Sequence, residues 1–242
     1  MSTDDESRRH VEEFLSNPLD RAFLSHPETA GTLVLVRHGQ QQRLGSSYPL
    51  AERIDPPLTD LGERQIRAVA AHLSSEPVDV VYSSTMRRAV ATAEVIAAAH
   101  DIGSTRVHDL REIGVLRDIP EGASLTEALE AVVRRGAAER FVNERRWEVY
   151  PMSETGPELR TRVTRAIEGI LASHAGETVV VACHGGVINA YLAHMLGVDE
   201  DMFFRPEHCS VHRIAFEGHR RVIRSLSEIH HLRDDGGDLV TV

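Results

Sequence analysis

The sequence contains only two cysteines, Cys183 and Cys209, and neither belongs to a CxxC pair or has the spacing of metal ligands. A disulfide-rich secreted fold is therefore excluded, and we expect reduced thiols in a reducing compartment. The longest apolar run is far shorter than the roughly 20 residues that a membrane-spanning helix needs. Residues 1–12 are polar and acidic, so no secretory signal is visible. We expect a cytoplasmic protein without membrane contacts.

Positive net charge is also missing. The 242 residues carry a formal net charge of −10 at pH 7, which disfavours nucleic acids and anionic membranes as general partners. A local basic pocket in such a chain still suits a small anionic substrate. The chain length and the apolar fraction of 41% are sufficient for one large domain with a sizeable core. The oligomeric state stays open, with a homodimer as one alternative.

The apolar pattern divides the chain into three segments. Residues 1–30 form a leader in which residues 8–24 have roughly helical apolar spacing, interrupted by Pro18. We expect this helix to pack on the edge of the domain, and binding to a protein partner is the alternative. Residues 31–233 form the globular domain, and residues 234–242 form a flexible tail.

An apolar strand at residues 32–36 ends in Arg37, His38 and Gly39. The strand shows no polar alternation, so helices are expected on both of its faces, as in a parallel sheet. Ligands of open α/β sheets bind beyond the carboxyl ends of the strands. The glycine permits a sharp turn and the close approach of a ligand. These residues therefore indicate a binding site at the end of this strand.

Residues 178–183 repeat this design, because the apolar strand is followed by His184, Gly185 and Gly186 and then at once by a helical pattern. The amides around Gly185 would lie at a helix N-terminus, which favours anions. Two strands that end in histidine at one edge, with an arginine and a helix N-terminus beside them, form a positive pocket. The pattern predicts that this pocket binds a phosphoryl group.

The rest of the chain alternates between strands and helices. Thr59 has the side chain of an N-cap for a helix over residues 60–73. The strand at residues 78–83 leads directly into an alanine-rich helix that carries Arg87 and Arg88. The alternation predicts an α/β fold, a three-layer α/β/α sandwich around a mostly parallel sheet. The other predicted elements are a short strand at 106–112, helices at 124–135, interrupted at Gly136, and at 156–173, and a hairpin of 210–216 with 220–226.

Four segments together point to a family, and a fifth matches a common structural turn of that family. They are residues 37–39 (Arg-His-Gly), 83–89, 110–112 and 184–186, with the turn at residues 58–62. With these segments in this order, the chain resembles the histidine phosphatase superfamily, which includes the cofactor-dependent phosphoglycerate mutases. In the second segment the family's arginine precedes an alanine, which selects Arg88 over Arg87. The resemblance implies a phosphoglycerate mutase-like fold.

The resemblance also implies a mechanism. His38 attacks phosphorus and forms a phosphohistidine. Glu112 protonates the leaving oxygen and then activates water. Arg37, Arg88 and His184 bind the phosphoryl oxygens and stabilise their charge in the transition state. We expect no metal and no cofactor, because arginines and histidines supply the positive charge.

Three further residues complete the expected substrate-binding set, namely Gln40 and Arg43 in the loop after the first strand and Gly185 at the start of a helix. The same loop departs from the family pattern, since Leu44 stands where an asparagine is common. The sequence leaves open whether the phosphate contact of this position is kept, and Gln41, Gln42 and Arg43 are the candidates to supply it.

The leading prediction is a metal-independent phosphomonoester phosphatase that acts on a small phosphorylated metabolite. One alternative is a phosphoglycerate mutase, for which Arg145 and Arg146 would supply additional positive charge. Another is a catalytically weak module that binds a phosphorylated ligand. The sequence leaves the particular phosphomonoester open. Two features are interpreted as structural: Cys183 as a small buried residue, and the pair at residues 230–231 as solvated histidines without a partner at ligand spacing.

Overall fold

The computed structural model describes residues 24, 29–45, 48, 50–115, 117–118, 125–233 and 238–241. The predicted leader of residues 1–30 lies almost wholly outside these ranges, and so does its predicted helix. Within the described ranges, no helix is long and apolar enough to cross a membrane.

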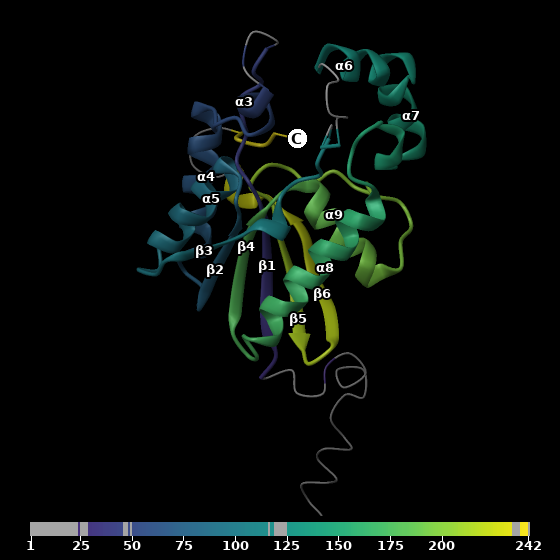
Figure 1. Ribbon diagram of the computed structural model, residues 1–242. Coiled ribbons are helices and arrows are strands. Elements are labelled where there is room, and N and C mark those ends of the chain that lie inside the picture. Colours follow the sequence, from purple (N-terminus) through teal and green to yellow (C-terminus); the bar gives the residue numbers. More distant parts are fainter. Residues whose placement is uncertain are drawn as a thin grey trace, which may run out of the picture.

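A mixed sheet forms the centre of the described part of the chain, with the strand order β3-β2-β4-β1-β5-β6. The adjacent strands β1 and β4 are parallel and lie in the middle (Figure 1). Strands β2 and β3 extend the parallel half, whereas β5 and β6 add an antiparallel hairpin at the other edge. The strands are β1 (Gly31–Arg37), β2 (Val80–Ser84), β3 (Ser104–Val107), β4 (Thr178–Cys183), β5 (Val211–Glu217) and β6 (Arg220–Glu228).

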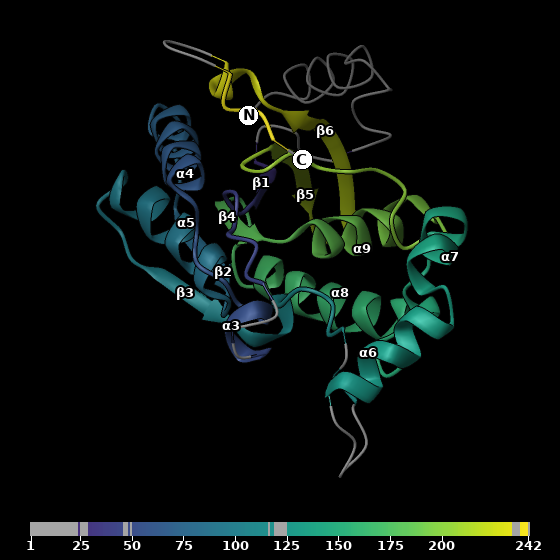
Figure 2. The ribbon, with the colours of Figure 1, turned by 90° about the horizontal axis from the view of Figure 1, so that it is seen from above.

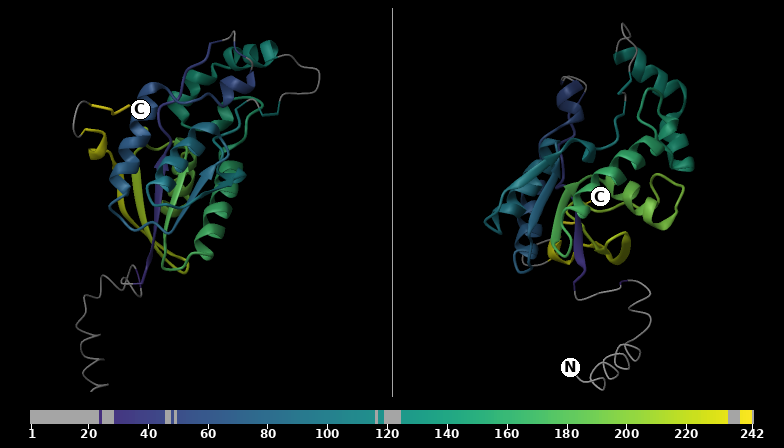
Figure 3. Two further views of the ribbon diagram at one scale, coloured as in Figure 1. Left: turned by 90° about the vertical axis from the view of Figure 1, so that its left-hand side faces the viewer. Right: turned by 60° about the horizontal axis from the view of Figure 1, so that its bottom comes forward.

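Helices cover both faces of this sheet (Figures 1 and 3). Side chains alternate along β1, so that Leu33 and Leu35 pack with α8 and α9, whereas Val34 and Val36 pack with α4 and α5. The two apolar clusters confirm the predicted three-layer α/β/α fold, and they explain why β1 is apolar throughout. The four helices are α4 (Asp60–Leu73), α5 (Arg87–Ala98), α8 (Gly156–Ala172) and α9 (Gly185–Leu196).

Shorter helices gather beyond the carboxyl ends of the parallel strands (Figures 1 and 2). They are α3 (Leu50–Ile54), α6 (Leu125–Arg134) and α7 (Ala137–Glu144), together with the 3₁₀ helix η2 (Trp147–Val149). Gly136 separates α6 from α7 with a φ of 57°, which confirms the predicted interruption there. These elements rise above the edge where the sequence predicted the site.

The loop after β1 packs tightly on the first turn of α4. A Cβ atom on Gly62 would lie 2.1 Å from the carbonyl oxygen of Gln40, and one on Gly39 would lie 2.7 Å from the carbonyl oxygen of Gly62. Thr59 caps α4 as predicted, because its hydroxyl accepts the N–H of Gly62 at 3.0 Å. The turn segment that the sequence singled out therefore supports the backbone directly beyond His38.

The strand predicted at residues 106–112 is shorter than expected. β3 ends at Val107, and the 3₁₀ helix η1 (His108–Leu110) follows it. The reason is a guanidinium from α8, since Arg162 donates to the carbonyl oxygens of Asp109 and Arg111 at 2.7 and 2.8 Å. Those carbonyls are bonded to a side chain rather than to a neighbouring strand.

The histidine pair at residues 230–231 also differs from expectation. His231 lies in the 3₁₀ helix η3 (His230–Leu232), is buried, and stacks on His72 of α4 with ring centroids 4.9 Å apart. The prediction of a solvated pair without a nearby partner is wrong for His231, because the chain after β6 folds back onto α4.

The predicted tail at residues 234–242 is described only at residues 238–241. These residues are hydrogen-bonded to the domain: the Gln65 amide donates to the carbonyl oxygen of Leu239 at 2.7 Å, and the N–H of His208 donates to the carbonyl oxygen of Thr241 at 2.8 Å. This part of the tail is thus attached beside the loop that precedes β5.

His212 in β5 is buried as a neutral imidazole. The N–H of Ser227 donates to its Nδ1 at 3.2 Å, so that Nε2 carries the proton and donates to the Ser210 hydroxyl at 3.0 Å. Burial is the main cause that lowers the pKa of His212 to about 4. Between pH 6.5 and pH 4 the unfolded chain therefore binds more protons at this residue than the folded chain, and stability falls as the pH falls.

We predict that replacement of His212 by glutamine weakens this pH dependence. With an unfolded pKa of 6.5 and a folded pKa of about 4, His212 alone removes about 2 kcal/mol of unfolding free energy between pH 7 and pH 5. Urea unfolding of the wild type and of His212→Gln at both pH values measures the difference. An equal loss in the two proteins would show that His212 is not the group responsible.

Candidate active site

The structure brings the two predicted histidines together at the carboxyl ends of the central strands. Arg37 and Cys183 are paired in the register of β1 and β4, so that His38 and His184 leave neighbouring strands at the same level. Their ring centroids are 5.0 Å apart. Both side chains are buried, with exposed fractions of 3% and 0%.

His38 has one ring nitrogen fixed by the backbone. Its Nδ1 donates to the carbonyl oxygen of Gly39 at 2.7 Å, which leaves the lone pair on Nε2. Arg88 donates its Nε–H to that Nε2 at 3.1 Å. Burial, followed by the positive charge of Arg88, holds the pKa of His38 well below its usual value. The ring is therefore neutral at pH 7 and its Nε2 is nucleophilic.

His184 is the N-cap of α9, and its two ring nitrogens have different surroundings. Its Nε2 is hydrogen-bonded to the hydroxyl of Ser84 at 2.8 Å, and that hydroxyl accepts the N–H of Met86. Its Nδ1 is buried without a hydrogen-bond partner among the described residues. Burial and the charge of Arg88 lower the pKa of His184 as well. When the serine hydroxyl donates to Nε2, Nδ1 carries a proton that can be donated to an anion.

Two arginines supply the positive charge, and the chain contains no lysine that could do so. Arg88 is only 4% exposed and donates to the carbonyl oxygen of Ile54 and to the carboxylate of Asp55. Arg37 donates to the carbonyl oxygen of Pro206, whereas its buried Nε has no partner among the described residues. A buried N–H without a partner is costly, so Arg37 Nε and His184 Nδ1 are natural donors to a bound anion.

Glu112 reaches the same place from the segment after η1. The N–H groups of Ile113 and Gly186 donate to its two carboxylate oxygens at 3.0 and 3.3 Å. Its negative charge acts on Arg37 and Arg88, opposing the fall of their pKa values on burial. A Cβ on Gly186 would lie 2.3 Å from Glu112 Oε1, so this carboxylate needs a glycine at the start of α9.

The remaining predicted residues lie around this centre. The Gln40 side-chain oxygen accepts the hydroxyl of Thr59 at 2.8 Å, so Gln40 is occupied in holding the turn. Arg43 is exposed and borders two cavities, and Leu44 borders one of them. A Cβ on Gly185 would lie 3.7 Å from Arg37 Nε, at ordinary contact distance.

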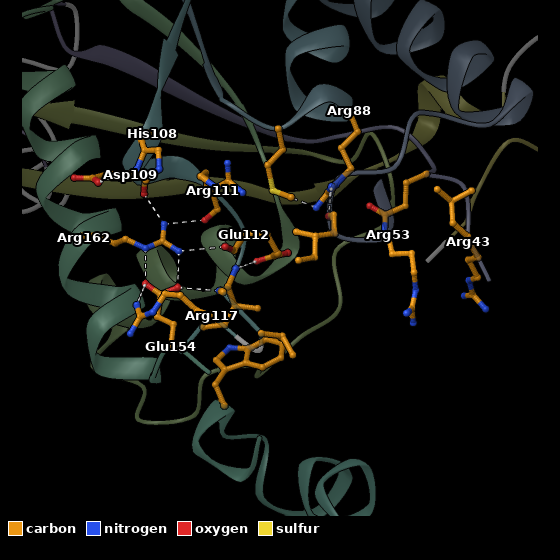
Figure 4. Close-up of a pocket in the computed structure, with 18 of the residues that line it drawn as sticks. Arg43, Arg53, Arg88, His108, Asp109, Arg111, Glu112, Arg117, Glu154 and Arg162 are labelled. Carbon is orange, nitrogen blue, oxygen red and sulfur yellow. Dashed lines mark hydrogen bonds and ion pairs between the residues drawn. The ribbon is translucent and has the colours of Figure 1, made fainter. Parts of the chain in front are cut away.

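Three cavities of about 960, 520 and 320 Å³ adjoin one another around these residues. Glu112 borders the first and second, Arg37 the second and third, and Arg43 the first and third. In the first cavity, Arg43, Arg53 and Arg88 lie on one side of Glu112 and the side chain of Arg162 lies on the other (Figure 4). Of the predicted catalytic residues, Arg37, Arg88 and Glu112 thus line these cavities.

Sequence reasoning missed the ion pair that supports Glu112. Arg162 of α8 makes two hydrogen bonds to the buried carboxylate of Glu154, and it also donates to the carbonyl oxygen of Glu112 at 3.3 Å (Figure 4). Glu154 in turn accepts the N–H of Gly114 at 3.1 Å. Neither residue belongs to a local motif, and α8 has many arginines, so no sequence signal singled out this pair.

His208 was missed as well. Its ring lies 5.7 Å from that of His38, and its Nδ1 is 2.9 Å from the hydroxyl of Thr241. Burial, followed by the charge of Arg37, lowers its pKa to about 3. Within the described ranges, the group of three side chains that could hold a metal ion lies elsewhere, at His72, His230 and His231.

Neutral buried imidazoles beside two buried guanidinium groups, at the carboxyl edge of an α/β sheet, are typical of proteins that handle phosphoryl groups. The family model of the histidine phosphatase superfamily (branch 1) matches residues 33–229, and the chain belongs to this superfamily. The predicted family and the predicted enzyme class, a histidine phosphatase, are confirmed.

Individual relatives agree with this assignment. Phosphoserine phosphatase 1 of Hydrogenobacter thermophilus is 30% identical over 204 residues, which cover 83% of this chain and 93% of the relative. Phosphoglycerate mutase-like protein 4 of Arabidopsis thaliana is 30% identical over 218 residues, covering 84% and 88%. The solved structure of YhfR from Bacillus stearothermophilus has a TM-score of 0.68 at 25% identity and covers 84% of this chain and 100% of its own. Activity as a phosphatase or mutase is supported at this level.

We predict that Arg162→Met destabilises the protein by about 3 kcal/mol, because it leaves the carboxylate of Glu154 buried without its bidentate partner. Arg117, 3.8 Å from that carboxylate, keeps the loss at the low end of the usual range. Arg165→Met is the matched control on the same helix, since Arg165 is 71% exposed in its pair with Asp109 and should cost less than about 1 kcal/mol. Urea unfolding measures both, and equal losses would contradict the prediction.

Proposed function

We propose that the protein is a metal-independent phosphomonoester phosphatase that forms a phosphohistidine on His38 and acts on a small phosphorylated metabolite. One observation carries the proposal: beside His38, whose Nε2 lone pair accepts only from Arg88, two buried donors have no hydrogen-bond partner among the described residues, Arg37 Nε and His184 Nδ1. A phosphoryl group placed there would accept both hydrogen bonds while its phosphorus lies before the nucleophile.

In the first step, Nε2 of His38 forms a bond to phosphorus and the bond from phosphorus to the ester oxygen breaks. Glu112, protonated at that moment, gives its proton to the leaving oxygen. Arg37, Arg88 and His184 stabilise the charge on the phosphoryl oxygens, a role for which their fixed positions require no reorganisation. The hydrogen bond from Nδ1 to Gly39 holds the ring as its charge rises.

In the second step, Glu112 takes a proton from water, and the oxygen of that water attacks the phosphohistidine. The bond from nitrogen to phosphorus breaks, inorganic phosphate leaves, and His38 and Glu112 return to their starting states. Access of water favours hydrolysis over transfer, since Glu112 borders two open cavities of about 960 and 520 Å³.

A phosphoglycerate mutase is the second candidate, supported by the name of the Arabidopsis relative. A mutase must keep water from its phosphohistidine and needs further basic residues around a small acid. Of the two arginines considered for this, Arg146 is paired with Asp199 at the surface and Arg145 borders only the second cavity among the three. Both observations favour the phosphatase.

The first cavity supports a substrate that carries more than its phosphate. Arg43 and Arg53 line it without a hydrogen-bond partner among the described residues, so they can meet a second anionic group, a carboxylate among others. Its apolar wall also accepts a carbon skeleton and consists of Leu44, Ile54, Met86, Val115, Leu129 and Trp147. The name of the Hydrogenobacter relative, a phosphoserine phosphatase, agrees with a small phosphorylated acid.

The test is phosphate release from p-nitrophenyl phosphate in the presence of EDTA, comparing the wild type with His38→Ala. We expect turnover by the wild type and a loss of at least about 10³-fold in the variant, because the covalent step is removed. A trapped phosphoenzyme, labile in acid and stable in base, should form only in the wild type. Phosphoserine and phosphoglycerates then serve as a panel for the natural substrate.

The opposing outcomes are distinct. Equal activity in both proteins would exclude His38 as the nucleophile. Loss of wild-type activity in EDTA with recovery on adding a metal would exclude the metal-independent mechanism. Transfer of the phosphoryl group between phosphoglycerates without release of phosphate would establish the mutase instead.

A pair of glycine variants tests the position of Glu112. Gly186→Ala is expected to lower kcat about 10²-fold or more, because its methyl group would lie 2.3 Å from Glu112 Oε1 and displace the acid. Gly185→Ala is the matched control, since its methyl group reaches Arg37 only at 3.7 Å. Steady-state kinetics with melting temperatures measure both variants. A normal kcat of Gly186→Ala would show that turnover does not require the position of the Glu112 carboxylate seen in this structure.

A further inference from the structure

A second cluster of histidines lies outside the catalytic centre. His72 comes from the last turn of α4, and His230 and His231 come from η3. One potential ligand atom from each of the three lies within 4.8 Å of the other two. The ring of His72 is 4.5 Å from that of His230 and 4.9 Å from that of His231. None of the three borders the cavities around His38.

Two of these rings hold an unused nitrogen in a buried position. His231, 8% exposed, donates its Nε2–H to the carbonyl oxygen of Cys209 at 2.9 Å, so its Nδ1 keeps a lone pair. That Nδ1 and the Nε2 of His72 are both buried without hydrogen-bond partners among the described residues. Unpaired buried acceptors are rare, and a backbone carbonyl on the opposite nitrogen is the usual support of a histidine that binds a metal.

The surroundings favour a cation. Glu76 and Glu228 each place a carboxylate oxygen 3.9 Å from His72 Nε2, and Arg213 is paired with both of them. Two carboxylates and one guanidinium leave one negative charge beside the imidazoles.

We propose that His72, His230 and His231 bind a zinc ion, with Glu228 or water as the fourth ligand. Neutral imidazoles with one oxygen ligand are a normal donor set for Zn²⁺, whose bonds to nitrogen are about 2.0–2.1 Å long. Ligand nitrogens in a tetrahedral site are about 3.4 Å apart, so the rings must turn inward. His231 is fixed by Cys209, whereas His72 has an unpaired Nε2 and His230 is exposed, and these two rings make the adjustment.

The ion would stabilise the fold and would take no part in phosphoryl transfer. Cys209 accepts a hydrogen bond from His231 and donates its own N–H to the carbonyl oxygen of Arg37 at 2.9 Å. Cys209 thereby links His231 to the main chain of Arg37, the residue before His38. Zinc would tie α4 and η3 to this segment and raise the stability of the domain.

The test uses the full chain, freed of metal by EDTA and returned to EDTA-free buffer at pH 7.5. At a ZnCl₂ concentration of about 100 times Kd, the wild type should melt about 5–10 °C higher. Metal analysis after gel filtration should find one zinc more per chain in the wild type than in His230→Ala, and Co²⁺ should give the visible spectrum of a tetrahedral site. His230 is exposed, so this variant should fold and keep its phosphate release at 25 °C.

Two controls separate this site from others. His194→Ala, which removes an exposed histidine of α9, and His38→Ala should both retain the zinc-dependent rise. His72→Leu should lose it, as His230→Ala does. An equal rise in the wild type and His230→Ala would overturn the proposal, and so would a rise that disappears only in His38→Ala, since the ion would then lie in the catalytic centre. These results do not depend on how phosphate is released.

Discussion

The hydrogen bond from His38 Nδ1 to the carbonyl oxygen of Gly39 is the contact on which the geometry of the site depends. It fixes the tautomer, so that Nε2 keeps a lone pair, to which Arg88 donates. The backbone can make this contact only because the loop after β1 lies close against α4, where neither Gly39 nor Gly62 has room for a side chain. The family signature at His38 and the turn around Gly62 therefore both position the His38 ring, although they are separate in sequence.

Burial is the second constraint, and it acts on every charge in the site. Desolvation lowers the pKa values of His38 and His184 and keeps both rings neutral. It also lowers the pKa values of Arg37 and Arg88, because burial disfavours their charged forms. Glu112 compensates for the two guanidinium groups, and backbone N–H groups hold its carboxylate in turn. A site built in this way favours an anion while the His38 ring stays unprotonated.

The sequence predicted the parts of the site that follow from local structure. His38 and His184 end apolar strands, and such strands pair in parallel and bring their carboxyl ends together. It did not predict Arg162 with Glu154, because Glu154 precedes α8 and the eight-residue separation matches neither helical spacing nor any short motif. For Gln40 the structure adds a second contact: its side-chain oxygen accepts from Thr59, and the residue lines the third cavity, so its predicted part in substrate binding stays a prediction.

The two histidine clusters show how surroundings decide what a neutral imidazole binds. Around His38 the neighbouring charges are guanidinium groups, so a ring that keeps its lone pair there meets an electrophilic phosphorus within an anion. Around His72 the nearest charges are two carboxylates that outweigh one arginine, so the same kind of lone pair favours a cation. The sign of the adjacent charge separates a nucleophile from a metal ligand, and only the folded chain places that charge.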